Sequence, residues 1–371
     1  MPAKLHLLHL IDKNRLNTGS VVQMLEAARG LALRGHDAWV GSRAGGDLEL
    51  ACANAGLQFL ELPLRSPWDA VSASRLRRHL RHHETDILHV HKGRAHGVGL
   101  VAATWTGHRP RLVVNRGVTF PLDLFNKWKY RHPRVASVVC VADAVREAAI
   151  QSGGLRRERV HTIHGGTDPG VFNPDRVDGR MIRLELGLGP EHIVVGQVSV
   201  RDWKGWPYLM AAFGLVAPRS PAARLLLVGC EPETRRTKVE EAVRKAGLVG
   251  RVMTLPFRTD MPEVLAACDV VVDSSWTGTG MTGTIREAMA MQRSVVATDC
   301  GGNRELVVDG EVGLVVPPRD PDALAAALAR LIDDPDLRKR LGTAGRKRVI
   351  EHFSTERRID RLEELYRRIL A

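Results

Sequence analysis

The stretch SSWTGTGMTGTIREAMAMQRSVVATDCGGNRE, residues 274–305, decides the fold. The apolar run DVVVD before it (269–273) predicts a buried parallel strand, and TIREAMAM (284–291) has the composition of a helix. A strand, a loop rich in Gly and Thr, and a helix start together direct free backbone N–H groups toward an anion. We therefore expect a phosphate-binding loop, with Glu287 on the first turn of the helix. The alternative is an ordinary strand–helix connection in which Glu287 only complements the helix dipole.

The loop has the residue types that a close approach to a ligand requires. Gly278, Gly280 and Gly283 have no side chain to hold a ligand away from the backbone. Thr282 and Thr284 have hydroxyl groups that can donate to a ligand or cap the helix.

Length and composition indicate two α/β domains. The chain has 371 residues, of which 44% are hydrophobic, 26% charged and 5% aromatic, and no stretch is apolar and long enough to span a bilayer. The apolar start, MPAKLHLLHLI, turns polar at once and lacks a cleavage site, so we interpret it as a first strand. The five cysteines have no paired spacing, which is typical of a reducing compartment and argues against a disulfide framework or a zinc site.

The positive charge is concentrated in the first half. The net charge is +12, and residues 1–180 hold 26 Lys and Arg against 16 Asp and Glu. Two clusters stand out, RLRRHLRHH (75–83) and KWKYRHPR (127–134). They form either a solvated arginine-rich face or a surface for an anionic membrane or an acidic acceptor. Nothing resembles a nucleic-acid-binding module, so we expect no nucleic acid partner.

Strand-like and helix-like segments alternate along the chain, which predicts doubly wound parallel sheets. The pattern is interrupted at HGGTDPGVFNPD (164–175) and then restarts. We predict an N-terminal domain (1–172), a C-terminal domain (173–354) and a C-terminal helix (355–371) that packs back toward the N-terminal domain. Ligands of open α/β sheets bind outside the carboxyl ends of the strands, so we expect a cleft between those edges. The strands are expected at 5–11, 38–40, 86–90, 112–115, 137–141, 160–163, 192–199, 225–228, 252–255, 270–273, 295–298 and 312–316, and the helices at 21–33, 284–291, 320–333 and 355–370.

Several polar residues follow these strands. Arg201 and Lys204, in RDWKGW, come after the strand that restarts the pattern and are suited to neutralising a diphosphate. The segment NTGS (17–20) is a second helix start without the full dinucleotide fingerprint GxGxxG. His89 and His91 share one face of a strand, either as packed polar side chains or as part of a site. No third ligand has a suggestive spacing, so no metal site is expected.

Taken together, these segments resemble glycosyltransferase family 4, the retaining enzymes of GT-B fold that use nucleotide sugars. The resemblance spans nearly the whole chain, and the segment at 285–306 is its most specific part. The resembling segments are NTGS with LALRGHDAWV (31–40), DILHVHKG (86–93), RVHTIHGGTDPGVF (159–172), WKGW (203–206), LLLVGCEP (225–232) and IREAMAMQRSVVATDCGGNREL (285–306).

The resemblance implies a role for each matching residue. Glu287 matches the second acid of an E-x7-E motif, which holds the ribose of the donor, and Lys204 matches the lysine on its diphosphate. Arg201 is a looser match near that lysine, with Gln197 where many members have arginine. Gly19 matches a glycine that faces the diphosphate from the other domain. The remaining donor-binding candidates are Thr279, Gly280, Met281, Thr282, Gly283, Thr284 and Arg258.

The chain also departs from the family pattern. Thr279 occupies the position of the first acid of E-x7-E, which usually holds hydroxyl groups of the donor sugar. Arg116, in NRG, occupies the position of a common histidine and is a candidate for contact with an acidic sugar or a donor phosphate. The linker asparagine of the family is Gly165 here. We count Arg116 and His91 among the catalytic candidates, together with Lys204, Arg201 and Glu287.

The expected reaction is transfer of a sugar from a nucleotide diphosphate to a hydroxyl acceptor, without a cofactor or metal. The sequence does not identify the base (UDP, GDP or ADP), the sugar, the acceptor or the oligomeric state. A cell-envelope glycan such as lipopolysaccharide, or a lipid-linked glycan, is the expected acceptor, in the cytoplasm or as a peripheral protein at the inner face of its membrane. Two other functions remain open, a nucleotide-sugar epimerase of the same architecture and a non-catalytic subunit that binds sugar nucleotides.

Overall fold

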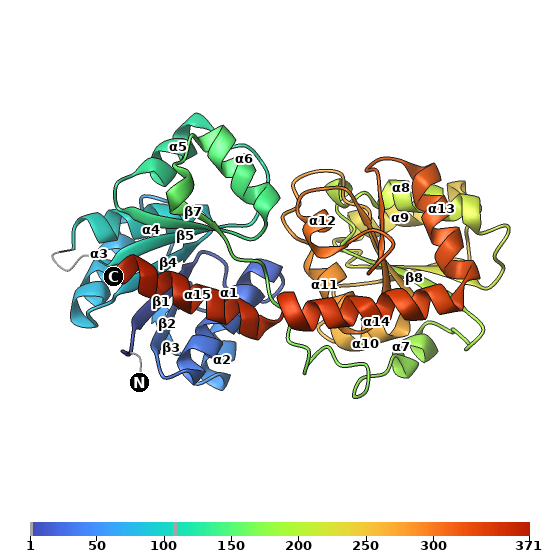
Figure 1. Ribbon diagram of the computed structural model, residues 1–371, viewed down its shortest axis with the longest axis horizontal. Helices are drawn as coiled ribbons and strands as arrows, with labels where there is room; N and C mark the ends of the chain where they lie inside the picture. Colours follow the sequence, from blue (N-terminus) through green and yellow to red (C-terminus); the bar gives the residue numbers. More distant parts are fainter. Residues whose placement is uncertain (1–2, 107–109) are drawn as a thin grey trace. The chain divides into compact units, whose positions relative to one another are not determined.

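The computed structural model describes residues 3–106 and 110–371 of the chain. It divides into two compact units, one comprising the residues up to Gly166 together with Thr355–Ala371, the other comprising Thr167–Ser354. Each unit contains a parallel sheet with helices on both faces (Figure 1). The predicted fold class, two doubly wound parallel-sheet domains, is therefore confirmed. The first unit ends at Gly166, whereas the sequence placed the end of the first domain at residue 172.

The first sheet has seven strands in the described part of the chain, in the order β3-β2-β1-β4-β5-β6-β7, and all of its pairs are parallel. All five residues of β4 are buried, as expected for a central strand covered on both faces. The edge strand β3 was not predicted, because its half-exposed sequence QFLE lacks an apolar run. The strands are β1 (His6–Ile11), β2 (Asp37–Ser42), β3 (Gln58–Glu61), β4 (Ile87–His91), β5 (Arg111–Arg116), β6 (Val135–Cys140) and β7 (Val160–Thr162).

The helices of the first unit cover this sheet on both sides. α1 packs against α15, while α3 contacts α4, α4 contacts α5, and α5 contacts α6. Figure 1 shows α4, α5 and α6 on the side of the sheet opposite α1 and α15. Right-handed crossovers in both directions from β1 and β4 produce this division. The helical elements are α1 (Gly19–Leu33), α2 (Asp47–Asn54), α3 (Ala70–His82), α4 (Gly93–Thr104), α5 (Leu124–Arg131), α6 (Asp143–Gly153), η1 (Arg157–Arg159) and α15 (Thr355–Leu370).

The C-terminal helix α15 is part of the core of the first unit. Ile359, Leu362, Leu365 and Tyr366 are buried in one cluster with side chains of α1 and the sheet. Full burial of each aliphatic side chain stabilises the fold by roughly 1.5–3 kcal/mol. A Cβ at Gly30 would lie 2.0 Å from Cδ1 of Ile359, so a larger residue at position 30 would require the Ile359 side chain to move.

The second sheet has six parallel strands among the described residues, in the order β10-β9-β8-β11-β12-β13. The sequence placed a strand at each of these positions, because each is an apolar run bounded by turn residues. The strands are β8 (Ile193–Val198), β9 (Ala223–Val228), β10 (Val252–Leu255), β11 (Val270–Asp273), β12 (Ser294–Thr298) and β13 (Leu314–Val316).

The sequence prediction located α11 and α13 among the helices of the second unit and omitted the others, including α14. α14 lies between the two predicted C-terminal helices, and it begins with the Asp334 side chain accepting from the N–H of Leu337 and with Pro335 as its first residue. The described parts of the chain, 3–106 and 110–371, contain no helix with the length and apolar character needed to cross a bilayer. The helical elements are α7 (Arg180–Glu185), η2 (Asp202–Lys204), α8 (Trp206–Val216), α9 (Glu233–Lys245), α10 (Met261–Ala267), α11 (Gly283–Ala290), α12 (Asn303–Leu306), α13 (Pro321–Asp333) and α14 (Pro335–His352).

Candidate active site

The two segments of the second half that were predicted to bind phosphate follow adjacent strands. β8 leads into η2, which ends at Lys204, and its neighbour β11 leads into the loop of Gly and Thr residues. The strand order reverses between β8 and β11, since β9 and β10 continue on one side and β12 and β13 on the other. In open α/β sheets, this reversal point is where ligands bind, outside the carboxyl ends of the strands.

Lys204 is held in place by its neighbours. Its Nζ lies 3.3 Å from Oδ1 of Asp273 and 5.0 Å from the centre of the Trp203 ring, and only 12% of its side chain is exposed. The next residue, Gly205, has a φ of +71°, and a Cβ there would lie 1.8 Å from the carbonyl oxygen of Ser274. The lysine loop therefore packs directly against the end of β11, and glycine is required at 205.

Gln197 joins the same two segments. Its Oε1 accepts hydrogen bonds from Oγ of Ser274 (2.7 Å) and from the backbone N–H of Ser274 (3.3 Å), and its Nε2 donates to the carbonyl oxygen of Lys204 (3.2 Å). The resemblance placed an arginine at this position in many family members. In this chain the residue is a buried amide that positions the backbone of the lysine loop.

Asp273, the last residue of β11, is a buried carboxylate that accepts from four different segments. Oδ1 accepts from Oγ of Ser275 (2.6 Å) and from the Lys204 ammonium, while Oδ2 accepts from Oγ1 of Thr282 (2.5 Å) and Nδ2 of Asn303 (2.9 Å). This residue connects the lysine loop, the Gly/Thr loop, the start of α11 and the start of α12. Sequence reasoning did not include Asp273 in the site.

The ionisation of Asp273 follows from these contacts. Burial acts to raise the pKa of the Asp273 carboxyl, but the Lys204 ammonium and the three neutral donors outweigh it, so the pKa lies below its usual value. Asp273 is therefore ionised at neutral pH. The ammonium group has three N–H donors. Contact with Asp273 occupies one of them and leaves two for a ligand.

The loops after β11 and β12 fix each other's backbone. The N–H of Gly302 donates to the carbonyl oxygen of Gly280 (2.6 Å). Gly301 has a φ of +58°, and a Cβ there would lie 2.0 Å from the carbonyl oxygen of Thr279. Both Thr279 and Gly280 are buried, while Met281 packs partly against the core of the second unit. The predicted donor-binding residues 279–281 therefore have a fixed backbone.

The start of α11 differs from the prediction in one respect. The Thr282 hydroxyl donates to Asp273 and does not cap the helix, and the helix begins at Gly283. Glu287 was predicted on the first turn, but it lies on the second, because the helix begins one residue earlier than expected. Thr284, half-buried, is in the first turn, which contains no acidic residue. An uncapped first turn without acidic side chains is suited to an anion.

Glu287 faces back toward the helix start. A Cβ at Gly283 would lie 3.5 Å from its Oε1. Burial raises the pKa of Glu287, and the neighbouring Arg286 only partly opposes that effect. The carboxyl group is therefore in a poorly hydrated position, where hydrogen-bond donors of a ligand would stabilise its charge.

Two other predicted site residues of the second half differ in whether their guanidinium groups are available to bind a ligand. Arg201, which precedes η2, is exposed. Arg258 is committed to ion pairs, since its guanidinium donates to Asp260 (2.6 and 2.8 Å) and to Glu185 (3.0 Å). These partners raise its pKa further. The structure thus gathers Lys204, the loop at 279–284 and Glu287 around the reversal point, whereas Arg258 follows the edge strand β10.

In the first unit, Gly19 and Arg116 follow strands of the sheet. Gly19 is the first residue of α1 and is exposed, with no atom within 4 Å of a Cβ placed there. Arg116 ends β5 and is buried; it donates to the carbonyl oxygen of Phe120, and its guanidinium lies 5.7 Å from the centre of the Tyr130 ring. Among the residues that the structure describes, its Nε has no hydrogen-bond partner. Arg116 therefore supports the segment after β5.

His91 belongs to a cluster of three buried histidines. His9 of β1 is in register with His89 of β4, and Nδ1 of His9 lies 3.3 Å from Nε2 of His91. Nδ1 of His89 lies 2.6 Å from the hydroxyl of Tyr366. Sequence reasoning missed His9, although its place on a strand adjacent to β4 would have identified it.

The electrostatics of the cluster favour a hydrogen-bonded core. Burial lowers the pKa of His9 to about 3 and places those of His89 and His91 well below the usual value, with Arg358 adding to each effect. The rings are therefore neutral. One nitrogen of each ring lies within 4.8 Å of the others, which is compatible with metal ligation. The positive charge of Arg358 beside the rings disfavours a divalent cation there, so we interpret the cluster as a network of neutral rings.

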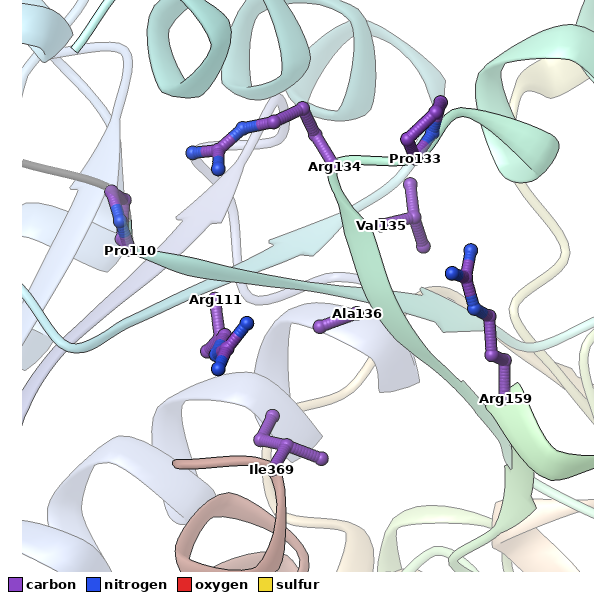
Figure 2. A pocket seen from close by; sticks show the side chains of 8 residues that line it. All are labelled: Pro110, Arg111, Pro133, Arg134, Val135, Ala136, Arg159 and Ile369. Atoms are coloured by element: carbon purple, nitrogen blue, oxygen red, sulfur yellow. The ribbon is translucent and has the colours of Figure 1, made fainter. Parts of the chain in front are cut away.

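A cavity of about 320 Å³ in the first unit lies away from these residues. Figure 2 shows its lining, in which Arg111 begins β5, Val135 begins β6 and Arg159 precedes β7. These are the amino ends of the strands, opposite the edge that carries Arg116 and His91. The guanidinium groups of Arg134 and Arg159 lie apart in Figure 2 and do not converge on one point. This cavity is therefore not the candidate active site.

Comparison with known proteins agrees with the geometry. The family described as "Glycosyltransferase Family 4" matches residues 17–171, and the family described as "Glycosyl transferases group 1" matches residues 189–334. The two matched regions lie in the two halves of the chain that hold the two sheets.

Curated relatives and solved structures extend this likeness. An alpha-D-kanosaminyltransferase of Streptomyces kanamyceticus is 29% identical over 253 residues, which are 67% of this chain and 64% of that protein. A lipopolysaccharide core biosynthesis mannosyltransferase, LpcC, of Rhizobium leguminosarum is 26% identical over 77% of this chain and 79% of that protein. The crystal structure of Anabaena HepE in complex with UDP-glucose superposes with a TM-score of 0.84 at 23% identity, covering 97% and 99% of the two chains.

These findings define the class of the protein. The chain belongs to glycosyltransferase family 4 and has the GT-B fold. It spans 64% of the length of the kanosaminyltransferase that it resembles.

Proposed function

We propose that the protein is a retaining glycosyltransferase that moves a sugar from a nucleotide diphosphate sugar to a hydroxyl group of a cell-envelope glycan. The observation that carries this proposal is the position of Lys204. Its ammonium lies at the reversal point of the second sheet, fixed by Asp273, close in the structure to an uncapped helix start.

The donor diphosphate binds between Lys204 and the loop at 279–284. The ammonium has two N–H donors left for phosphate oxygens, and the first-turn amides of α11 supply further donors. Glu287 accepts from the ribose hydroxyls, where its poorly hydrated carboxylate gains most from a hydrogen bond. HepE, which shares the fold, was crystallised with UDP-glucose, which supports a nucleotide sugar as the donor.

The protein accelerates transfer by stabilising the leaving diphosphate. Negative charge grows on the diphosphate as the glycosidic bond breaks, so a fixed ammonium and fixed amides bind the transition state more strongly than the ground state. Arg201, exposed beside this loop, adds a second cation. The departing phosphate takes the proton of the acceptor hydroxyl on the same face of the sugar, and this retains the anomeric configuration.

The acceptor binds to the first unit, near the carboxyl ends of β1, β4 and β5. Arg116 supports this edge, and its Nε–H has no partner within the described part of the chain. A lipopolysaccharide core or another envelope glycan, including a lipid-linked one, is the acceptor class. The name of the Rhizobium relative and the excess positive charge of the first half support this class. The expected place of action is the cytoplasm or the inner face of its membrane.

A thermal-shift screen of UDP, GDP, ADP and their sugar conjugates tests donor binding. A selective ligand raises the Tm of the folded protein by mass action. We expect the nucleotides of one base to raise the Tm of the wild-type protein. The same nucleotides should leave the Tm of Lys204→Ala unchanged. Absence of any shift with all three diphosphates would contradict the proposal.

Transfer itself is tested with the selected donor and glycan or lipid extracts, with NMR of the product linkage. We expect a product with the anomeric configuration of the donor. Conversion of the donor to another sugar nucleotide without acceptor would identify an epimerase. Tight nucleotide binding without transfer to any extract would identify a non-catalytic subunit.

A further inference from the structure

Two helices of the first unit combine the two basic clusters of the sequence with exposed aromatic side chains. α3 contains Arg75, Arg77, Arg78 and Arg81, and α5 contains Lys127, Lys129 and Arg131. Neither helix contains an Asp or Glu. The acids that precede them serve as caps, since Asp69 accepts from the N–H groups of Val71 and Ser72 and Asp123 accepts from the N–H of Asn126.

A tryptophan pair joins the segment before α3 to α5 at the surface. Trp68 precedes α3 and Trp128 belongs to α5, and their rings stack with centroids 5.6 Å apart and an interplanar angle of 3°. The segment before α3 lies close over α4, because a Cβ at Gly97 would come within 2.4 Å of the carbonyl oxygen of Pro67. Despite the stacking, 48% of Trp68 and 39% of Trp128 are exposed.

Further exposed apolar side chains lie close to this pair in the sequence. Leu124 is 84% exposed, while Phe120 and Val71 are each 49% exposed. Along α3 the positions 71, 75 and 78 share one side, and along α5 the positions 124, 128 and 131 do. This side of α3 begins with Val71 and continues with two arginines. This side of α5 begins with two apolar residues and ends with Arg131, whose Nε donates to the carbonyl oxygen of Gly153. We call Trp68, Val71, Phe120, Leu124 and Trp128, with the exposed Arg75, Arg78 and Arg131, the α3–α5 face.

We propose that the α3–α5 face docks the protein on an anionic lipid bilayer. Tryptophan and leucine side chains are stable at the boundary between headgroups and acyl chains, where an aromatic ring is partly buried and its N–H stays hydrated. Arginines without acidic neighbours on their own helix attract anionic headgroups at the same time. A purely electrostatic partner would account for the arginines but not for an exposed leucine and two exposed tryptophans.

This docking surface would also deliver an acceptor. The segment that carries Phe120 and leads into α5 starts from Arg116 at the carboxyl end of β5. A glycan on a lipid anchor in that bilayer would reach the acceptor edge of the same unit. Membrane docking requires neither donor nor transfer, so its test is independent of the proposed reaction.

Co-sedimentation of the full chain with vesicles measures the docking. We compare vesicles of phosphatidylcholine alone with vesicles that contain about 30 mol% phosphatidylglycerol. We expect binding only to the anionic vesicles, weakened by raising the salt from about 0.1 M to about 0.5 M, because salt screens exposed charges. Equal binding to both kinds of vesicle, or no binding to either, would overturn the proposal.

Substitutions in the α3–α5 face test whether this face is the surface that binds the vesicles. We expect Arg75→Glu with Arg78→Glu to weaken vesicle binding by about 25-fold or more, since each lost basic charge near an anionic bilayer weakens binding about fivefold. We expect Leu124→Ser, tested separately, to weaken binding by about tenfold, since an exposed leucine inserts its apolar surface. The matched controls are Arg244→Glu with Lys245→Glu on α9, and Val249→Ser, all exposed residues of the second unit. All these positions are exposed, so circular dichroism should show folded proteins. Equal losses in the controls would contradict the assignment.

Tryptophan fluorescence distinguishes a bilayer from a soluble polyanion. Brominated lipids should quench the emission of the bound wild type, and the quenching should disappear in Trp68→Phe with Trp128→Phe. Binding of a soluble polyanion to this face, with no quenching by brominated lipid, would assign the face to an anionic polymer and overturn membrane docking.

Discussion

The ammonium nitrogen of Lys204 lies 3.3 Å from a carboxylate oxygen of Asp273, so the last residue of β11 fixes the cation that follows β8. The same carboxylate accepts from Thr282, directly before α11. A single buried anion thus sets the distance between a lysine and a helix start. This relationship gives the candidate site its rigidity and leads to the following predictions.

Replacing Lys204 tests its role in binding the diphosphate. Lys204→Ala removes the cation beside the buried Asp273 carboxylate but leaves it three hydrogen-bond donors, so we expect a less stable but folded protein. Loss of a charge-assisted contact made mainly in the transition state should lower kcat/KM by about 10³-fold. Lys339→Ala, at an exposed lysine of α14, is the control and should retain activity. Near-normal turnover of Lys204→Ala would refute the assignment.

Replacing Asp273 tests whether its buried carboxylate stabilises the candidate site. Asp273→Asn removes the buried charge and directs an amide N–H₂ group toward donors. We expect the free energy of unfolding to fall by about 3 kcal/mol, as when one partner of a buried ion pair is removed. Asp334→Asn is the control, because asparagine caps a helix as well as aspartate does, and its effect should stay within about 0.5 kcal/mol. Denaturant unfolding measures both values, and equal stability of the two variants would contradict a central role for Asp273.

The stability difference between wild type and Asp273→Asn should depend on pH with a defined sign. The folded-state pKa of Asp273 is lowered, so its stabilising contribution is fully present above its unfolded-state pKa of about 3.9 and is lost as the pH falls through the folded-state value. The stability difference between wild type and Asp273→Asn should be constant from about pH 6 to 8 and should shrink below about pH 4. A difference that does not change in acid would show that the charge contributes nothing.

Gly205 and Gly250 form a matched pair for the lysine loop. Both have a positive φ, +71° and +77°, but a Cβ at 205 would lie 1.8 Å from the carbonyl oxygen of Ser274, whereas a Cβ at 250 meets nothing within 4 Å. We expect Gly205→Ala to destabilise the protein by about 2 kcal/mol more than Gly250→Ala and to weaken nucleotide binding. Similar Tm values for the two variants would argue against the close packing.

Glu287→Gln separates binding from stability. Burial raises the pKa of Glu287, so the stability it contributes is present below its unfolded-state pKa of about 4.3 and is lost as the pH rises through the folded-state value. At pH 8 the glutamine variant should therefore have an equal or higher Tm, while its KM for the donor rises about tenfold through a weaker ribose contact. Unchanged KM values would remove Glu287 from the donor site.

Much of the fold was predictable because it is encoded locally. Apolar runs such as 270–273, bounded by turn residues, specify buried parallel strands, and their alternation with helices specifies a doubly wound sheet. Lys204 and the Gly/Thr loop were predictable for the same reason, because each directly follows such a run. The sequence prediction omitted the half-exposed strand β3 and most of the helices between the predicted strands, including α14, whose start signals, Asp334 and Pro335, were overlooked.

The missed residues depend on tertiary contacts. Asp273 was interpreted as the end of a strand, yet its donors Lys204 and Asn303 come from positions 69 and 30 residues away. His9 required knowledge that β1 pairs with β4. The start of α11 depended on the Thr282 hydroxyl, which binds Asp273 instead of capping the helix. No local pattern encodes these contacts.

A crystal structure of the protein with the nucleotide sugar selected by thermal shift tests the central claim most directly. We predict diphosphate oxygens within about 3 Å of Nζ of Lys204 and of the first-turn amides of α11, with the ribose hydroxyls on Glu287. A nucleotide bound elsewhere, with Lys204 and Glu287 not contacting it, would contradict the account.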